Sequence, residues 1–270
     1  MAELPDIAPL LERVRAIAGE AAAAILKVYA TDFEVEAKAD RSPLTLADRA
    51  AHDCIVEALG ALTPAWPVLS EESDPQVHQA RHAWRRFWLV DPLDGTREFV
   101  KRNGEFTVNI ALIDDGRPVL GVVQVPVTGR CYAAAQGQGA WRHEADGDAG
   151  RLRVSDWRGG RALRVVCSRS HRSPDLEALL GQLPQIEEIA VGSSLKMCLV
   201  AEGSADFYPR LGPTSEWDTA AAHCVVEQAG GALTGLDLEP LRYNKPSILN
   251  PSFVAFGRGE RPWAAHLRAG

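Results

Sequence analysis

A short apolar run that leads straight into an acidic, proline-containing segment constrains the fold of this chain more than any other feature. Phe87–Val90 is the apolar run, and residues 91–96 follow it as Asp-Pro-Leu-Asp-Gly-Thr. A compact apolar run of this length predicts a buried strand. Because proline cannot donate a hydrogen bond to a neighbouring strand, we expect the strand to end at Asp91. Gly95 permits a tight turn there, and Thr96 can open the next helix.

The first half of the chain has the pattern of two helices and an antiparallel sheet. Apolar residues recur at helical spacing before residue 60, and strict alternation over 106–112 predicts a half-buried strand. Asp115-Gly116, just after that strand, is a hairpin signal. The expected elements are helices over about 6–29 and 46–59, the second capped by Thr45, and strands over 68–69, 87–90, 106–112, 119–125 and 131–135.

The pattern changes after a polar, glycine-rich stretch at 143–160. Beyond this stretch, strand and helix patterns alternate, which implies a second layer of sheet and helices. We therefore expect a division into an α+β subdomain, residues 1–150, and an α/β subdomain, residues 151–270. The expected elements of the second subdomain are a strand over 163–167 and helices over 174–180, 194–202 and 217–228, the last one ended by Gly230-Gly231.

Charge and cysteine usage limit the classes of function. The formal net charge of −7 argues against a protein that holds nucleic acid by bulk electrostatics, because phosphate backbones are bound by basic patches. The acidic N-terminus lacks the features of a signal peptide, and no apolar run has the length of a membrane span. Five scattered cysteines without a CxxC pair are typical of buried, reduced thiols. We expect a cytoplasmic protein; the sequence leaves peripheral contact with the inner membrane and the oligomeric state open.

Acidic residues stand out at four places in the chain. Asp91 and Asp94, three residues apart around a tight turn, can face one point, and the carbonyl of Leu93 can face it as well. Oxygen ligands without histidine or cysteine select Mg²⁺ or Mn²⁺ over zinc. The N–H groups at the following helix start form an anion site beside them. The acidic residues concerned are Asp48, Glu71, Glu72, Asp91, Asp94 and Asp218.

Each of these acids also has a purely structural interpretation. Residues 91–96 could be an Asp-Pro turn with a capped helix, although the apolar strand before them and the added Gly-Thr favour chemistry. Asp218 could be a charge that complements a helix dipole. Asp48 stands three residues after Thr45 and could be half of a capping box. The pair at 71–72 could belong to a solvated turn.

Three motifs together resemble the inositol monophosphatase superfamily. They are Glu71-Glu72, residues 91–96 and the segment Trp-Asp-Thr-Ala-Ala at 217–221. The chain is more similar still to the 3'(2'),5'-bisphosphate nucleotidase branch of CysQ type. The resemblance covers nearly the whole chain in order and is weakest over 143–160. The further segments that carry it are 38–43, 67–72, 88–96, 101–112, 168–171, 192–196, 208–210 and 212–214.

This resemblance implies an α/β fold of mixed α+β type, an αβαβα layered sandwich. It implies hydrolysis of the 3'-phosphate of adenosine 3',5'-bisphosphate, and of its sulfated form 3'-phosphoadenylyl sulfate, the small-molecule partners of sulfate assimilation. The implied cofactor is Mg²⁺, as two or three ions. Residues 1–150 would carry most of the metal ligands, and residues 151–270 would carry Asp218 and the nucleotide contacts.

The resemblance assigns roles position by position. Asp48 and Thr96 would orient or deprotonate the attacking water. A third ion would lie near Glu71 and Asp48, and Glu72, counted with the catalytic residues, would support it. The matched metal ligands are Glu71, Asp91, the Leu93 carbonyl, Asp94 and Asp218. The matched substrate contacts are His171, Ser193, Lys196 and Arg210, together with Gly95, Thr96 and the metal-side residues Glu71, Leu93, Asp94 and Asp218.

The expected reaction is an in-line displacement at two or three metal ions. One Mg²⁺, held by Glu71, Asp91 and the Leu93 carbonyl, would lower the pKa of a bound water. A second ion, held by Asp91, Asp94 and Asp218, would neutralise charge on the leaving 3'-oxygen. Because a carboxylate has two oxygens, Asp91 is the natural bridge between the two ions.

The basic residues would bind the second phosphate of the substrate. Arg210 offers a planar fork and Lys196 a point charge, and the alternative for both is ordinary surface solvation. His171 follows a strand and could instead cap a turn.

Three other functions compete with this interpretation. The same chemistry could act on inositol monophosphate or fructose 1,6-bisphosphate, although segments 168–171 and 192–196 favour the nucleotide. A non-catalytic nucleotide sensor would not need the water-activating set. A structural Ca²⁺ site is disfavoured because the ligands come from distant segments and not from one loop.

Overall fold

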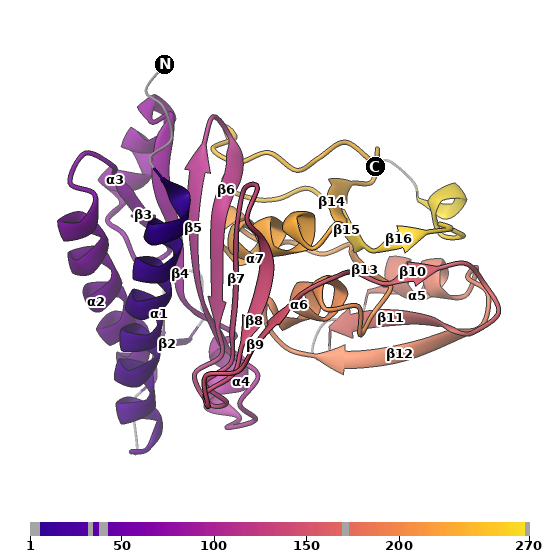
Figure 1. Cartoon of the computed structure of the whole chain (residues 1–270), viewed down its shortest axis with the longest axis horizontal. Helices are drawn as coiled ribbons and strands as arrows, with labels where there is room; N and C mark the ends of the chain where they lie inside the picture. Colours follow the sequence, from indigo (N-terminus) through magenta and orange to yellow (C-terminus); the bar gives the residue numbers. More distant parts are fainter. Residues whose placement is uncertain (1–5, 32–34, 38–42, 169–172, 268–270) are drawn as a thin grey trace.

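Helices and sheets alternate in five layers along the long axis of the molecule (Figure 1). Helices α1 (Ile7–Tyr29) and α2 (Leu46–Leu62) cover the outer face of a seven-stranded sheet. Helices α6 (Leu195–Ala201) and α7 (Glu216–Gln228) lie between this sheet and a five-stranded one. Helix α5 (Pro174–Leu180) packs on the far face of the five-stranded sheet. The expected αβαβα sandwich is confirmed.

The computed structural model describes residues 6–31, 35–37, 43–168 and 173–267. Within these ranges, no helix has the length and hydropathy needed to cross a membrane. Two segments that carried the resemblance fall partly outside them: most of 38–43, and 169–171 with His171.

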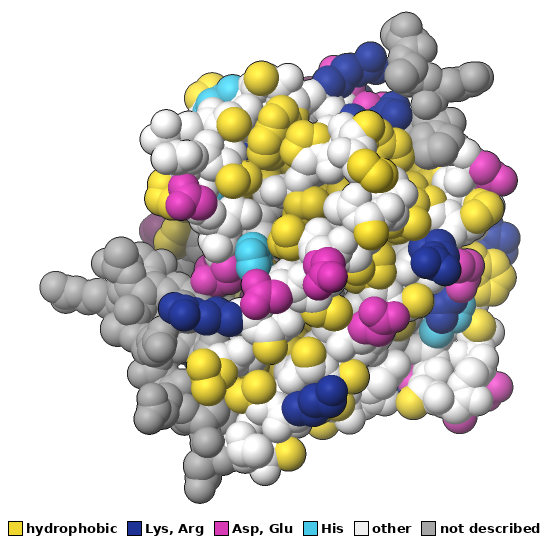
Figure 2. All heavy atoms as spheres, turned by 90° about the vertical axis from the view of Figure 1, so that its left-hand side faces the viewer, with side chains coloured by type: hydrophobic (Ala, Val, Ile, Leu, Met, Phe, Trp, Pro, Cys, Tyr) yellow, Lys and Arg dark blue, Asp and Glu magenta, His cyan; other side chains and the backbone are white. Residues whose placement is uncertain are grey.

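The described part of the outer helical layer shows no continuous basic surface. Figure 2 looks onto the side formed by α1 and α2, where acidic and basic side chains are scattered singly among apolar ones in the described portion of that face.

The seven-stranded sheet is antiparallel except where β3 pairs with β4. The hairpin between β5 and β6 turns at Asp115 and Gly116, whose φ angles of 51° and 72° are those of a two-residue turn that matches the strand twist. The predicted hairpin is therefore confirmed. In order across the sheet the strands are β3 (Val68–Ser70), β4 (Arg86–Asp94), β5 (Thr107–Asp114), β6 (Arg117–Gln124), β7 (Cys131–Ala135), β8 (Gly139–His143) and β9 (Ala149–Arg151).

Strand β4 does not end at Asp91, so that prediction was wrong. The strand continues to Asp94, and its pairing with β5 shifts register between these two residues. Pro92 lies inside this register shift, where it is not paired with a residue of β5. Its missing N–H group therefore leaves no hydrogen bond between the strands unmade. The consequence is that both aspartates are held by a sheet and not by a free turn.

Strand β5 is buried on both faces, so the half-buried prediction was also wrong. Val108, Ile110 and Leu112 pack under the outer helices, whereas Ala111 and Ile113 pack toward α7. Alternate residues of β5 therefore face two different buried layers, and neither face of the strand is exposed to solvent. Its polar members are buried as well, at the end of the strand near Asp94.

The five-stranded sheet has the order β12-β11-β13-β15-β14 and mixes parallel with antiparallel pairs. Strand β12 was not predicted, because it is an edge strand that carries exposed glutamates. The strands are β11 (Leu163–Ser168), β12 (Ile186–Val191), β13 (Phe207–Arg210), β14 (Ala232–Gly235) and β15 (Phe253–Phe256).

Short elements complete the fold. Helix α4 (Thr96–Val100) follows β4 directly, as predicted, with Gly95 at its N-cap in the left-handed conformation at φ 95°. Helix α2 runs three residues beyond its predicted end, and the side chain of its predicted cap, Thr45, is outside the described set. The remaining elements are the strand pairs β1 (Val35–Ala37) with β2 (Pro43–Thr45) and β10 (Asp156–Trp157) with β16 (Arg258–Gly259), helix α3 (Pro75–Ala80), and 3₁₀ turns at 81–83 and 264–266.

Helix α7 belongs to the second half of the sequence but packs on the first sheet. Its residues share one core cluster with residues of both sheets. The division at about residue 150 stays a prediction; β9, which ends at Arg151, is the last strand of the first sheet. The five cysteines are free thiols, four of them buried and Cys54 partly so.

Candidate active site

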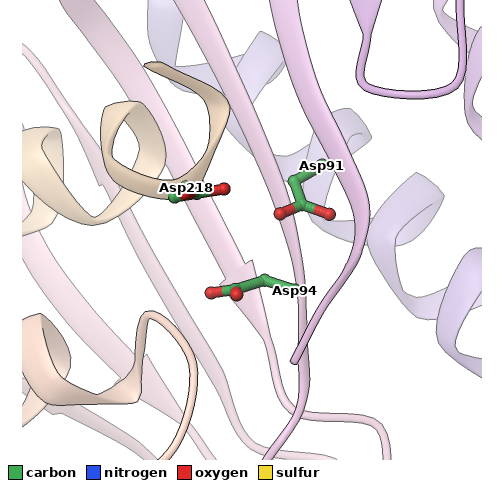
Figure 3. Close-up of side chains that lie close together, drawn as sticks. All are labelled: Asp91, Asp94 and Asp218. Atoms are coloured by element: carbon green, nitrogen blue, oxygen red, sulfur yellow. The ribbon is translucent and has the colours of Figure 1, made fainter. Parts of the chain in front are cut away.

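Three carboxylates from two distant segments of the chain meet in one place. Asp91 and Asp94 come from β4, and Asp218 comes from the first turn of α7. One oxygen of each lies within 4.8 Å of the others, so the group could hold a metal ion. Figure 3 shows the three side chains pointing toward one another.

Local structure fixes the direction of two of the three carboxylates, Asp91 and Asp218. The N–H of Leu93 donates to Oδ1 of Asp91 at 3.0 Å, within the register shift of β4. The N–H of Ser215 donates to Oδ2 of Asp218 at 2.8 Å, which forms a capping box at the start of α7. Asp218 thus lies in the first turn of α7, where its charge complements the helix dipole as the sequence suggested, and it also forms a capping box that was not predicted. Because the cap uses one oxygen, the other can still serve the cluster.

Burial makes this concentration of negative charge costly. The pKa of Asp91 is raised well above its usual range, first by burial and then by Glu71, Asp94 and Asp218. The pKa of Asp218 is raised in the same way. Burial also raises the pKa of Asp94, although Lys196 and hydrogen bonds oppose this shift. A bound cation would relieve the repulsion, since opposite charge favours the ionised form of a carboxyl group.

The cluster opens into a pocket of about 240 Å³ between β4, α4, α6 and α7. Asp48 and Glu72 do not line it, but Asp48 is buried and contributes to the raised pKa of Asp91. His171 lies outside the described residues. The predicted site residues that do line the pocket are Glu71, Asp91, Leu93, Asp94, Gly95, Thr96, Ser193, Lys196, Arg210 and Asp218.

Three cationic side chains line the pocket among the described residues: Lys196 and Arg210, which were predicted, and Arg97, which was not. Lys196 is 8% exposed, and its ammonium donates to the carbonyl of Ser193, so ordinary surface solvation is excluded for it. Burial lowers its pKa, and Asp94 opposes that shift. Arg210 donates from Nη2 to the carbonyl of Pro213 at 2.9 Å. Its Nε is buried without an acceptor among the described residues, and a buried donor of this kind gains free energy from an anionic ligand.

Close packing holds the loop 192–194 against helix α4 and the segment before β5. The N–H of Gly192 donates to a carboxylate oxygen of Glu105 at 2.9 Å. A Cβ at position 192 would lie 2.7 Å from Cγ of Glu98, so only glycine fits there. This contact places Ser193 and the start of α6 beside the carboxylate cluster.

Sequence reasoning missed the polar residues that hold Asp94. Ser194 donates its backbone N–H to Oδ2 of Asp94, and Asn109 donates to the same oxygen at 3.5 Å. The available signal was the polar Asn109 within an otherwise apolar strand. Ser194 gave no comparable signal, because serine at a helix start is an ordinary cap.

Comparison with known proteins identifies the class. The family model described as "Inositol monophosphatase family" matches residues 6–268, and the chain belongs to this family. Among characterised relatives, the chain is 51% identical over 247 residues to the 3'(2'),5'-bisphosphate nucleotidase CysQ of Escherichia coli K12, covering 90% of this chain and 98% of that protein. It is 36% identical over 256 residues to the protein of the same name from Haemophilus influenzae, covering 94% of this chain and 95% of the other.

Solved structures of the inositol monophosphatase family also match this chain. The crystal structure of CysQ from Bacteroides thetaiotaomicron matches with a TM-score of 0.78 and 41% identity, covering 92% of this chain and 98% of that one. An IMPase of Thermotoga maritima matches with a TM-score of 0.77 at 22% identity, over 96% of this chain and 94% of the other, which supports the fold alone. The resemblance inferred from the sequence motifs is confirmed.

Proposed function

We propose that this chain is a Mg²⁺-dependent 3'(2'),5'-bisphosphate nucleotidase. It removes the 3'-phosphate of adenosine 3',5'-bisphosphate and of 3'-phosphoadenylyl sulfate, in sulfate assimilation and nucleotide turnover. The observation that carries the proposal is one pocket lined by the carboxylate cluster of Asp91, Asp94 and Asp218 together with the predicted cationic side chains Lys196 and Arg210. The names of the relatives supply the substrate class.

The donor set fits a hard divalent cation. Carboxylate oxygens dominate the site, and their mutual repulsion is what a divalent ion would offset. We assign Glu71, Asp91 and the Leu93 carbonyl to one Mg²⁺, and Asp91, Asp94 and Asp218 to a second. A third ion could lie near Glu71 and Asp48. When bound, Mg²⁺ supplies an activated water and neutralises charge on the leaving oxygen.

The chain's own residues would then handle the proton and the substrate. Thr96 lines the pocket at the start of α4, where its hydroxyl can orient the attacking water. Asp48 is buried close enough to raise the pKa of Asp91, and we assign it the role of accepting the proton through Thr96. Glu72 follows the ligand Glu71 in the chain and would support it from outside the pocket.

The second phosphate of the substrate would bind opposite the metal cluster. Arg210 would offer the Nε donor that has no acceptor within the described chain, and Lys196 a buried positive charge. Ser193 lines the same side of the pocket. We keep His171 as a proposed contact on the strength of the sequence motif alone. A cytoplasmic location belongs to the proposal and is supported by the five free thiols.

Phosphate release from a small substrate panel tests the proposal. We expect hydrolysis of adenosine 3',5'-bisphosphate and 3'-phosphoadenylyl sulfate in the presence of Mg²⁺, with no release when EDTA replaces the metal. Inositol 1-phosphate and fructose 1,6-bisphosphate should be poor substrates. Preference for inositol phosphate would support the rival phosphatase. Nucleotide binding without phosphate release would instead indicate a sensor.

Arg210→Ala should discriminate between substrates. Losing a charged hydrogen bond costs about 1.5–3 kcal/mol, so kcat/KM for adenosine 3',5'-bisphosphate should fall on the order of 10–100-fold. Hydrolysis of adenosine 3'-monophosphate, which lacks the second phosphate, should change little. Steady-state kinetics on both nucleotides measure this ratio. Arg158→Ala is the control, because Arg158 is exposed and pairs with Asp156 on the surface. Equal losses on both substrates would contradict the assigned role of Arg210.

A further inference from the structure

A buried chain of three polar side chains ends on the carboxylate of Asp94. Thr107, Asn109 and Ser194 are each at most 1% exposed. The hydroxyls of Thr107 and Ser194 lie 2.8 Å apart, and Oγ of Ser194 lies 2.9 Å from Oδ1 of Asn109. Nδ2 of Asn109 then lies 3.5 Å from Oδ2 of Asp94. Three fully buried polar groups in an otherwise apolar layer need a reason beyond packing.

The chemistry of these groups fixes the direction of every hydrogen bond. The amide of Asn109 must turn its NH₂ group toward Asp94, because its oxygen would repel a carboxylate. Its oxygen therefore faces Ser194, whose hydroxyl donates to it. Since Ser194 has one hydroxyl hydrogen, Thr107 must donate to Ser194. The chain thus runs from Thr107 through Ser194 and Asn109 to Asp94.

Oδ2 of Asp94 consequently accepts two N–H groups, one from Asn109 and one from the backbone of Ser194. This leaves Oδ1 as the oxygen of Asp94 that is available to a cation. The arrangement also joins two layers of the fold, because Asn109 belongs to β5 and Ser194 is the N-cap of α6.

We propose that Thr107, Ser194 and Asn109 are positioning residues that orient the Asp94 carboxylate for Mg²⁺ binding. The proposal rests on the proposed function, since it needs Asp94 to be a metal ligand. Partners that orient a metal ligand without touching the metal typically change metal affinity about 10–100-fold when they are removed. These three residues therefore control the affinity of the site for Mg²⁺ although none of them is a proposed metal ligand.

Magnesium titrations without substrate test this proposal. Asn109→Leu keeps the number and branching of the side-chain heavy atoms but removes the donor, and should raise the Mg²⁺ concentration for half-maximal thermal stabilisation at least about 10-fold. Thr107→Val removes only the first hydroxyl of the chain and should give a smaller shift in the same direction. Thr107→Ser keeps that hydroxyl and loses a methyl group, so it should bind Mg²⁺ like the wild type. The same order should appear in the Mg²⁺ dependence of phosphate release.

Thr234→Val is the matched control, because Thr234 is buried and its hydroxyl donates to the carbonyl of Gly235, away from the site. It should leave the Mg²⁺ titration unchanged. Wild-type titrations for both Asn109→Leu and Thr107→Val would overturn the proposal. If Asn109→Leu does not fold, the Mg²⁺ titrations of Thr107→Val and Thr107→Ser are compared instead. Equal Mg²⁺ affinities of these two variants would overturn the proposal. A wild-type protein that neither binds Mg²⁺ nor releases phosphate would overturn the proposed function itself, and this proposal with it.

Discussion

Asp91→Asn should almost abolish phosphate release while raising the melting temperature of the metal-free protein. Asp91 is crowded by other acids, since four of them raise its pKa in addition to burial. Removing its charge removes a proposed ligand of both ions, and we expect a loss on the order of 10³-fold, about 4 kcal/mol of transition-state stabilisation. Asparagine keeps the oxygen that accepts the N–H of Leu93, so the local fold should survive.

The gain in stability should depend on pH in a defined direction. The pKa of Asp91 is higher in the folded chain than in the unfolded one, so the folded state holds its proton more tightly. The metal-free wild type therefore loses stability as the pH rises from about 4, where the unfolded carboxyl ionises, through the raised pKa. The advantage of the Asp91→Asn variant should be largest at neutral pH and should vanish below about pH 4.

Thermal melts in EDTA across pH, together with phosphate release in Mg²⁺, measure both effects. For a chain of this size, 1 kcal/mol corresponds to roughly 2–4 °C in Tm. Adding Mg²⁺ should stabilise the wild type much more than the variant. Glu20→Gln, which removes an exposed carboxylate on α1, should change neither quantity. An Asp91→Asn protein that is folded and active would refute the metal assignment.

The residues that carry chemistry were more predictable than the contacts that position them. Asp91 and Asp94 stand out in the sequence because charged residues directly after an apolar strand have few structural explanations. Ser194 and Asn109 act through contacts between segments that are distant in the chain. The sequence alone gives no measure of such contacts, so the hydrogen bonds to Asp94 could not be predicted.

The errors about the first sheet have one physical cause. The alternation in β5 and the proline in β4 are local signals. The alternation was interpreted as if only one face of the sheet were covered, and the proline as if β4 ended at an exposed edge. Helix α7 covers the second face, although it comes from the other half of the chain. The resulting burial explains why Asp91 and Asp94 sit in continuous sheet at an irregular register and not in an exposed turn.

Gly121→Ala should be strongly destabilising, because α7 approaches β6 too closely there for any side chain. A Cβ at this position would clash with the carbonyl oxygen of Ala221 and lie 2.9 Å from Cβ of Cys224. Backbone cannot rotate away as a side chain can, so the helix must move. We expect a loss of about 3 kcal/mol, near the upper end for overpacking, and a fall of roughly 6–12 °C in Tm.

The same displacement should reach the active site. Helix α7 carries Asp218, which faces Asp91 and Asp94 on the sheet, so a helix pushed outward separates the three carboxylates. Mg²⁺ should therefore stabilise Gly121→Ala less than the wild type, even at temperatures where the variant is folded. Gly60→Ala is the control: Gly60 lies in α2 with nothing within 4 Å of an added Cβ, and alanine there should add up to about 1 kcal/mol of stability. Unchanged Tm and Mg²⁺ response in Gly121→Ala would mean that contact between β6 and α7 does not set the geometry of the site.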